Sequence, residues 1–443
     1  MSFDLGIRAG HLLTMKGGLG DVATDQFIGI KDGLIIEVAP FQSSQQKAAG
    51  QFYDLSSKIV LPGLINAHTH LSMVLFRGYE DDRPFQEWLF KYILPLEAKS
   101  VREEFIRVGT SLAALESIRF GTTFVNDMYF FCNTAADVLI QSGLRAHVAW
   151  PFMDFETPEE RSQGPAGIQN RVSNFKKFCE KYATHPRVRP AIGPHAPYSC
   201  SDNTLREVEA LSREMAVPIH IHLSESQTEF DESLKKYGKS PTKRLHDLGL
   251  LSPNLIAAHC VHFTDEDIEL FKNSGAAMIY NPDSNMKLSS GTAPIARFRK
   301  AGIPVALGTD GAASNNDLSM FGAMDIGTKL QKLAGGEGAT MGALDALNLA
   351  TYEGAHALGM GNQIGTIEVG KRADIIALRT DLPHVKPLYS VLSQLVYAYQ
   401  GLEVDTVICD GNTLFHQDRF LTLDANAIYQ DTEKMRLQLR QSF

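Results

Sequence analysis

Short apolar segments alternate with amphipathic helical stretches through the middle of the chain, and this alternation limits the choice of fold. Eight segments are predicted strands, at 63–70, 122–128, 145–150, 188–195, 217–223, 255–260, 276–281 and 303–310. Strands that alternate with helices along a chain pair in parallel, because each helix returns the chain to the same edge of the sheet. Eight such units predict an α/β fold, a (β/α)8 TIM barrel.

A doubly wound open sheet is the alternative to a barrel. That fold places a glycine fingerprint after its first strand, where this sequence has His68-Thr69-His70 instead. Two helix starts have the spacing of a capping box, Ser100 with Glu103 and Thr264 with Asp267. We therefore expect helices to begin at both places.

The two ends of the chain have the same β-branched character, which differs from that of the middle. Residues 27–40 are interrupted by Asp32-Gly33, a hairpin signal, and segments 365–379 and 403–415 are similar in composition. A length of 443 residues fits a barrel of roughly 250 residues with an accessory domain. We predict a barrel over 62–361 and one discontinuous β-sandwich domain from 1–61 and 362–443, with a C-terminal helix.

Charge and composition exclude several classes of protein. Lys and Arg total 42 against 51 Asp and Glu, a net charge of −9, which argues against binding of nucleic acid. No run reaches the roughly 18 apolar residues of a membrane span, and the first residues lack the pattern of a signal peptide. Five cysteines without a CxxC pair predict reduced thiols in a cytoplasmic protein. Base rates favour a two-fold homodimer.

Polar side chains gather where the predicted strands end, which is where barrel enzymes carry their chemistry. His68 and His70 are two residues apart on one strand and so point the same way, and His222 and Asp310 end two other strands. Neutral imidazoles with a carboxylate suit a transition metal, although a pair of hydrogen-bonded core histidines is the alternative. We predict one divalent metal, zinc first, with iron or manganese as alternatives.

Two further residues at the strand ends have the chemistry of proton transfer. Glu225 follows His222 by three residues, and its carboxylate could move a proton between a water molecule and a substrate nitrogen. His259 could polarise the attacking water, whose pKa falls toward about 7 on a bound metal. The alternatives are an ordinary loop glutamate and a packed core histidine. His220 lies one layer deeper than His222, and we interpret it as structural.

Four segments resemble the amidohydrolase superfamily: LPGLINAHTH (61–70), HLSE (222–225), AAHC (257–260) and LGTDGAASNN (307–316). Within it the chain is most similar to the 5′-methylthioadenosine/S-adenosylhomocysteine deaminases, through FRGYEDDRPFQEWLFKYILPLE (76–97), NDMYF (126–130) and GPHAPYSCS (193–201). The resemblance implies a metal-dependent enzyme that deaminates the adenine ring of a small nucleoside, namely methylthioadenosine, S-adenosylhomocysteine or adenosine.

The resemblance also implies a role for each matching residue. The metal would be held by His68, His70, His222 and Asp310, and the catalytic residues would be Glu225, His259 and Asp310. Glu225 would protonate the ring nitrogen, His259 would orient the water, and Asp310 would carry a proton to the leaving ammonia. Substrate contacts would come from Glu97 at the ribose diol, His195 at the purine, Trp88 near the sugar, Ser314, and Arg145 at the homocysteine carboxylate.

Some alternatives stay open at this point. A second carboxylate-binding arginine is expected in the loop after Arg145, where the sequence offers Arg161 and Arg171. A two-metal member of the superfamily would need a lysine at the end of the fourth strand, which here ends in His195, so one metal is expected. Other substrates of this superfamily are triazines, pterins and guanine, and a catalytically silent barrel scaffold is the alternative from another class.

Overall fold

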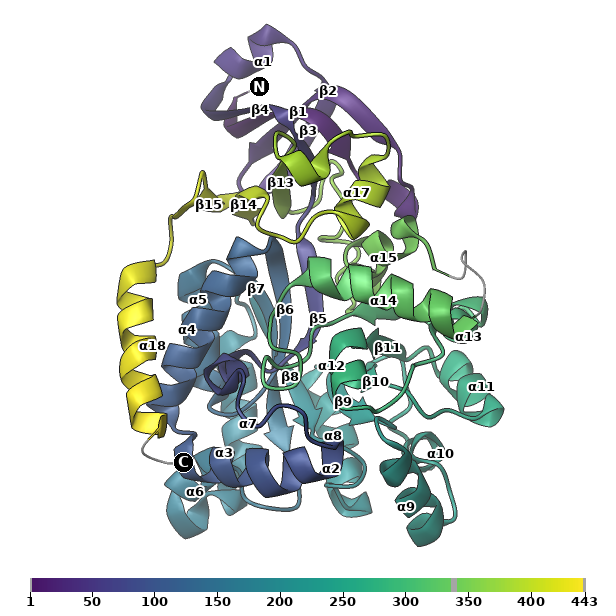
Figure 1. The fold of residues 1–443 in the computed structure, drawn as a ribbon. Coiled ribbons are helices and arrows are strands. Elements are labelled where there is room, and N and C mark those ends of the chain that lie inside the picture. The colour runs from purple at the N-terminus through teal and green to yellow at the C-terminus, as the bar shows by residue number, and fades with distance from the viewer. Residues whose placement is uncertain (1, 336–340, 441–443) are drawn as a thin grey trace.

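Two eight-stranded sheets divide the chain into a barrel and a smaller β-domain packed against one end of it (Figure 1). The computed structural model describes residues 2–335 and 341–440. The barrel lies in the middle of the sequence, and the β-domain is built from both ends of the chain. No helix of these described residues is long and apolar enough to cross a membrane.

The first sheet is a parallel barrel whose strands are neighbours in chain order. Its strands are β5 (Leu64–Thr69), β6 (Thr122–Met128), β7 (Arg145–Phe152), β8 (Val188–Pro194), β9 (Ile219–Leu223), β10 (Leu255–His259), β11 (Ala277–Tyr280) and β12 (Val305–Leu307). The last strand closes on the first, because the Asp310 amide donates to the His68 carbonyl over 3.0 Å. The Asn66 side chain also donates to the Thr309 hydroxyl over 2.7 Å. The predicted TIM barrel is confirmed.

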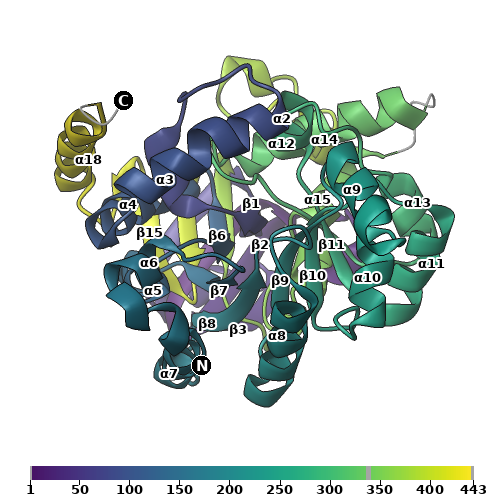
Figure 2. The same cartoon turned by 90° about the horizontal axis from the view of Figure 1, so that it is seen from below.

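Helices ring this barrel, as the view along its axis shows (Figure 2). They are α4 (Glu103–Arg119), α5 (Cys132–Ser142), α6 (Pro158–Ser162), α7 (Arg171–Tyr182), α8 (Asp202–Met215), α9 (Gln227–Tyr237), α10 (Pro241–Asp247), α11 (Asp265–Ser274), α12 (Pro282–Lys287), α13 (Ile295–Lys300), α14 (Met320–Gly335), α15 (Ala343–Leu349) and α16 (Tyr352–Ala357). Between β5 and α4 the chain forms a short 3-10 helix η2 (Leu71–Phe76), α2 (Phe85–Glu87), a π-helical turn η3 (Trp88–Ile93) and α3 (Leu94–Ser100).

The second sheet joins the two ends of the chain. Its strands are β1 (Phe3–Leu13), β2 (Val22–Lys31), β3 (Leu34–Pro40), β4 (Ala49–Pro62), β13 (Ile375–Arg379), β14 (Val404–Cys409), β15 (Asn412–His416) and β16 (Arg419–Phe420). Strand β4 pairs with β13, so N-terminal and C-terminal segments share one ladder. The sandwich formed from both ends is confirmed, and the boundaries at 61/62 and 361/362 stay predictions. Small helices α1 (Ser43–Lys47) and α17 (Val391–Tyr397) accompany this domain.

Of three local signals in the sequence, the hairpin turn and one capping box are confirmed, and the other capping box is wrong. Asp32 and Gly33 turn the β2–β3 hairpin with φ values of 51° and 74°, the left-handed region that such turns require. Thr264 and Asp267 form the predicted capping box of α11. Ser100 does not cap a helix. It ends α3, and α4 begins at Glu103 after Arg102, because the chain continues the preceding helix up to Ser100.

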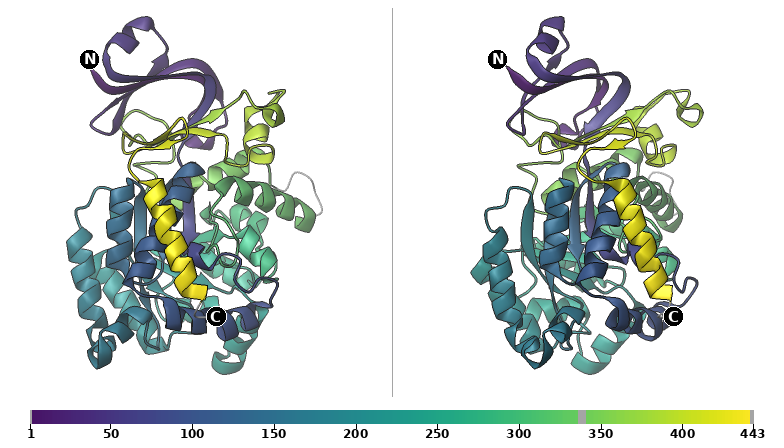
Figure 3. Two further views of the ribbon diagram at one scale, coloured as in Figure 1. Left: turned by 60° about the vertical axis from the view of Figure 1, so that its left-hand side comes forward. Right: turned by 90° about the vertical axis from the view of Figure 1, so that its left-hand side faces the viewer.

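The predicted C-terminal helix exists as α18 (Ala425–Arg440), and it lies along the barrel rather than on the sandwich (Figure 3). Its buried residues Met435 and Leu439 join the apolar cluster that includes Phe105 of α4. Arg102 also donates to Gln438 over 3.1 Å. The helix therefore fastens the end of the second domain to the outside of the first.

Candidate active site

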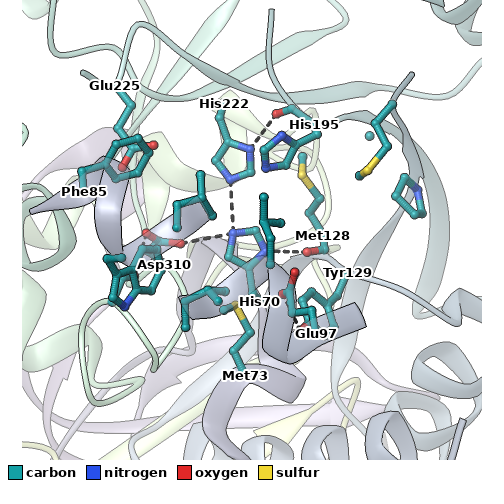
Figure 4. Close-up of a pocket in the computed structure, with 18 of the residues that line it drawn as sticks. His70, Met73, Phe85, Glu97, Met128, Tyr129, His195, His222, Glu225 and Asp310 are labelled. Carbon is teal, nitrogen blue, oxygen red and sulfur yellow. Dashed lines mark hydrogen bonds and ion pairs between the residues drawn. The ribbon is translucent and has the colours of Figure 1, made fainter. Parts of the chain in front are cut away.

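A pocket opens at the carboxyl ends of the barrel strands, the end of the barrel away from the sandwich (Figure 1), and Figure 4 shows side chains that line it. Its volume is about 840 Å³, including the space that is open to solvent at its mouth. Most of its wall is apolar, and the polar side chains in it are those of His70, Glu97, Tyr129, His195, Tyr198, His222, Glu225, His259, Asp310 and Ser314. The carboxyl ends of β5, β9 and β10, with the turns that follow β5, β9 and β12, therefore bring the predicted histidines and carboxylates to one place.

Four of the predicted metal ligands converge at the floor of this pocket. Nε2 of His68 and Nε2 of His70 each lie 3.3 Å from Oδ1 of Asp310. Nε2 of His70 lies 3.1 Å from Nε2 of His222. The ligand atoms of His68, His70 and His222 lie within 4.8 Å of one another, and so do those of a second group, His68, His259 and Asp310. These imidazole and carboxylate donors are of the types that bind a divalent transition metal.

The outer nitrogens of these imidazoles are all engaged elsewhere. Nδ1 of His70 donates to the carbonyl of Met128, and Nδ1 of His222 donates to the carbonyl of His195 over 2.7 Å. A carbonyl can only accept, so each of these rings, when neutral, carries its proton on Nδ1 and turns the Nε2 lone pair inward. Nε2 of His68 is buried and faces Oδ1 of Asp310 at 3.3 Å, and no described residue forms a hydrogen bond of normal geometry with it. This arrangement fits a bound cation, which would use those lone pairs.

The charges around this point also suit a cation. Burial lowers the pKa of His68 to about 4, so its ring is neutral at pH 7. Burial acts in the same direction on His70, but the hydrogen bond and charge of Asp310 outweigh it and raise the pKa of His70 to about 9. The negative charge of Asp310 thus favours a cation at the floor of the pocket. A divalent metal would compete with the proton on His70 for the same lone pair.

Two carboxyl groups of the pocket differ in protonation. Burial, reinforced by the charge of Asp310, raises the pKa of Glu225 well above its usual range. Burial alone would also raise the pKa of Asp310, but the imidazoles of His68 and His70, which face its carboxylate, outweigh burial and hold that pKa well below its usual range. At neutral pH, Glu225 can give a proton and Asp310 can accept one, a division of roles typical of acid–base catalysis.

The strand ends at the site have a backbone conformation that is rare for residues with a side chain. Ser224, His259 and Asp310 have φ values of 50°, 73° and 64°. Non-glycine residues in the left-handed region cost free energy, and such residues cluster at functional sites. The strained turns aim the side chains at the ends of β9, β10 and β12 into the pocket.

The other side of the pocket offers groups that suit a nucleoside. Tyr129 donates to Oε1 of Glu97 over 2.7 Å, which leaves the second carboxylate oxygen for a ligand. Trp88 lies in the wall, on the π-helical turn η3. His195 lies at the end of β8 beside His222. Ser314 also lines the pocket, and its hydroxyl donates to Oδ2 of Asp310 over 2.9 Å.

Comparison with known proteins decides the family. The sequence model of the amidohydrolase family matches residues 59–414. The chain belongs to the amidohydrolase family. A 5-methylthioadenosine/S-adenosylhomocysteine deaminase of Caldanaerobacter subterraneus subsp. tengcongensis is 41% identical over 377 residues, 85% of this chain and 86% of that protein. A 5′-deoxyadenosine deaminase of Methanocaldococcus jannaschii is 41% identical over 388 residues, 87% and 90% of the two chains.

A solved structure resembles this amidohydrolase along almost its whole length. The adenosine deaminase of Xanthomonas campestris, crystallised with bound zinc, superposes with a TM-score of 0.95 at 34% identity. The match covers 99% of each chain. The resemblance seen in the sequence is confirmed, and a divalent metal at the site agrees with the family.

Arg145 is not in the active site of this amidohydrolase, so its predicted contact with a substrate carboxylate is wrong. It is the first residue of β7, at the amino end of the barrel, and it is only 1% exposed. Its guanidinium donates to both carboxylate oxygens of Asp374, over 3.0 and 3.1 Å, and to Asp410 over 3.2 Å. This pairing joins the barrel to the sandwich, because Asp374 and Asp410 belong to the second domain.

The two other arginines considered for the carboxylate are also bonded to protein groups. Arg171 donates to the carboxylate of Glu160 over 2.8 Å and to the carbonyl of Met153 over 2.6 Å. Arg161 donates to the carbonyl of Ala98 over 3.3 Å. Neither side chain lines the pocket as the structure describes it. Arg171 instead holds the loop that carries Met153 and Phe155 into the wall.

Several supporting residues of this amidohydrolase were not identified from the sequence. Glu229 accepts from the amides of Ser224 and Glu225 over 3.0 and 2.9 Å, and so fixes the turn that carries the acid. The spacing of Ser226 and Glu229 is a capping-box pattern and could have revealed this residue.

Helix α12 supplies two more supporting residues. Ser284 donates to Oδ2 of Asp310 over 2.6 Å, and Oδ1 of Asn285 lies 2.8 Å from Nδ1 of His259. Because an amide oxygen accepts, Asn285 keeps the His259 proton on Nδ1 and leaves Nε2 free to face the pocket. No local pattern in the sequence marks these two residues.

Proposed function

We propose that this amidohydrolase removes the 6-amino group from the adenine ring of 5′-substituted adenosines, with water as co-substrate and ammonia as the second product. One observation carries the proposal. A buried cluster of ligand-type donors, an acid and a base lies at one side of a mostly apolar pocket, and a buried carboxylate suited to a ribose diol lies at the other. The names of the similar deaminases support the same reaction.

The proposed cofactor is one zinc ion per subunit, held by His68, His70, His222 and Asp310. A zinc ion in a site of this kind lowers the pKa of a water molecule and makes it a nucleophile at neutral pH. Iron and manganese remain alternatives, because the same donor set suits them. Zinc in the structure of the similar adenosine deaminase favours the first choice.

The protein's own groups then move the protons. His259, held by Asn285, hydrogen-bonds the attacking water and orients it toward C6 of the purine. Asp310 accepts a proton from that water, and Glu225 gives its proton to N1, so that C6 becomes tetrahedral. Asp310 then passes its proton to the departing amino nitrogen, and the C6–N6 bond breaks. The C6 hydroxyl returns its proton to Glu225 as C6 becomes a carbonyl, and ammonia leaves.

A spectrophotometric screen of the zinc-loaded enzyme tests this proposal. The panel is methylthioadenosine, 5′-deoxyadenosine, S-adenosylhomocysteine, adenosine and free adenine, with guanine, a pterin and a triazine as the competing heterocycles. We expect turnover of the adenosines only. Turnover of the competing heterocycles alone would favour another amidohydrolase reaction, and no turnover with no bound metal would favour a silent scaffold.

The pocket predicts a preference for an uncharged 5′ group. Apolar side chains that include Phe85, Leu89, Phe130, Met153 and Phe155 form its wall, and the described lining contains no Lys or Arg. A buried carboxylate without a cationic partner loses about 1.5–3 kcal/mol of charged hydrogen bonding, which corresponds to roughly 10–100-fold. We therefore expect kcat/KM for methylthioadenosine and 5′-deoxyadenosine to exceed that for S-adenosylhomocysteine by about this factor.

Arg161 provides the control for this preference. Its side chain is exposed, and it donates to the carbonyl of Ala98, the neighbour of Glu97 in the pocket. Arg161→Ala should leave the kcat/KM ratio of the two substrates unchanged. Equal kcat/KM for both substrates in the parent enzyme, with a selective loss on S-adenosylhomocysteine in Arg161→Ala, would contradict the prediction.

The proposed ribose contact predicts a pH dependence of substrate binding. Burial raises the pKa of Glu97 to about 7, against the opposing hydrogen bond from Tyr129. The carboxylate that accepts the diol hydroxyls is therefore present above pH 7 and is lost as the pH falls. Below pH 7, KM for adenosine should rise by about tenfold per pH unit, because the ionised fraction falls in that proportion.

A substrate without the diol isolates this effect. 2′,3′-Dideoxyadenosine, which lacks both hydroxyls of the ribose diol, should bind weakly, and its KM should not follow the ionisation of Glu97. Glu97→Gln should raise KM for adenosine and remove its dependence on pH near 7. The role of Glu97 is refuted if the parent enzyme has the same pH profile of KM for both substrates.

Three expectations about the oligomeric state, the location and the partners of the protein remain predictions. A two-fold homodimer rests on base rates alone. A cytoplasmic location and the lack of nucleic-acid binding rest on the cysteine pattern and the net charge of −9.

A further inference from the structure

A second histidine lies directly beneath the proposed metal ligands, inside the barrel. His220 is on β9, two residues before His222 and on the same face of the strand. Its Nε2 lies 2.8 Å from Nδ1 of His68, and both side chains are fully buried. Within the described chain, His220 is the only hydrogen-bond partner of this nitrogen of His68.

This contact differs in kind from those of the other two ligand histidines. His70 and His222 donate to carbonyl oxygens, which fix the proton on Nδ1. An imidazole nitrogen can accept or donate, so the contact with His220 fixes His68 only if Nε2 of His220 is the acceptor. If His220 donated instead, His68 would carry its own proton on Nε2, and that nitrogen could not bind a cation.

The position of His68 makes the direction of this hydrogen bond important for metal binding. Nε2 of His68 faces Oδ1 of Asp310 at 3.3 Å, at the deepest point of the donor cluster. The ring of His220 stands almost perpendicular to that of His68, with an interplanar angle of 85°. In this edge-to-face arrangement, a hydrogen bond between the two nitrogens would hold the His68 ring in its orientation.

We propose that His220 is a positioning residue whose Nε2 accepts a hydrogen bond from Nδ1–H of His68 and thereby keeps Nε2 of His68 available to the metal. The inference rests on the proposed metal site and goes beyond it, because it assigns a role to a residue outside the ligand set. Groups of this kind orient metal ligands, and their loss typically weakens metal affinity about 10–100-fold.

Two variants with amide side chains of different length test whether Nε2 of His220 is the acceptor. His220→Gln places an amide oxygen near the position of Nε2, whereas His220→Asn ends near the position of Nδ1 and cannot reach His68. Zinc affinity is measured by competition with a chromophoric chelator, and the thermal midpoint of the metal-free form reports folding. We expect His220→Asn to weaken zinc binding about 10–100-fold and His220→Gln to stay within about threefold of the parent.

His147 provides a matched control inside the same barrel. It is on β7, is 4% exposed and contacts Phe124, and the described residues include no hydrogen bond between it and His68. His147→Asn should leave zinc affinity unchanged. Parent-like affinity in His220→Asn, equal losses in His220→Gln and His220→Asn, or an equal loss in His147→Asn would each overturn the proposal.

A measurement on the parent enzyme keeps the proposal testable if a variant does not fold. Neutron diffraction of the zinc-loaded crystal should place a deuterium on Nδ1 of His68, pointing to a bare Nε2 of His220. A deuterium on Nε2 of His220 along that contact would overturn the proposal. If the parent enzyme binds no zinc, the proposed metal site itself is wrong. If the parent binds zinc and the variants bind it with the same affinity, only the role of His220 is refuted.

Discussion

Replacing Asp310 by Asn should lower kcat by about 10³–10⁴-fold while the fold survives, because the change removes the proposed base and an anionic metal ligand together. The pKa of Asp310 is held well below its usual range by His68 and His70, so the parent residue is ionised at neutral pH. An amide keeps an oxygen that can accept from Ser284 and Ser314, but it cannot take a proton from water. Steady-state deamination by the zinc-saturated variant measures the loss.

Metal content and a neighbouring variant separate the two causes of this loss. The zinc stoichiometry of Asp310→Asn, measured beside kcat, shows whether the ion is still bound when turnover stops. Asp317→Asn is the matched control in the same loop, where the side chain accepts from the amide of Ser319 over 2.8 Å. An Asn side chain can accept from the backbone amide two residues further on as Asp does, so kcat and the thermal midpoint should not change. Full activity of zinc-replete Asp310→Asn would refute the mechanism.

Replacing Glu225 by Gln should have the second largest effect, a fall in kcat of about 10²–10⁴-fold. Burial raises the pKa of Glu225 well above its usual range, so the parent residue holds the proton that the purine nitrogen would receive. Gln has nearly the same shape but no acidic proton. Because Glu225 is not among the proposed ligands, zinc affinity should remain that of the parent, and KM should change little.

Glu232→Gln is the control for the loss at Glu225. Glu232 lies on the exposed face of α9, seven residues further along the chain. Its substitution makes the same chemical change away from the proposed metal ligands, and it should leave kcat unaltered. If Glu225→Gln turned over adenosine at the parent rate, another group would have to supply the proton and the assigned role would be wrong.

Much of the fold could be predicted because local patterns encode it. Each of the eight predicted barrel strands overlaps an observed one, and His68, His70, His222 and Asp310 lie at or just beyond strand ends, as predicted. A parallel barrel places every strand's carboxyl end at the same mouth, so residues far apart in sequence meet without further information. The apolar segments and their polar last residues were therefore sufficient to predict the donor cluster.

Arg145 shows where the local pattern was misread. It begins β7, so the same rule that brings the ligands together places its guanidinium at the opposite end of the barrel. Its partners Asp374 and Asp410 lie more than 200 residues away in the sequence. The position of Arg145 on its strand could have excluded it from the pocket, but the ion pair that it forms could not have been foreseen.

The sequence by itself determined the barrel, the sandwich from two chain ends, and the types of donor at the strand ends, because periodicity and strand polarity are local properties. Only the tertiary structure decided which groups hold those donors in place. The carbonyls of Met128 and His195 accept from His70 and His222, His220 contacts His68, and Asn285 contacts His259. These contacts join side chains to groups on other strands and helices. They depend on register and packing between elements, which no single segment of the chain specifies.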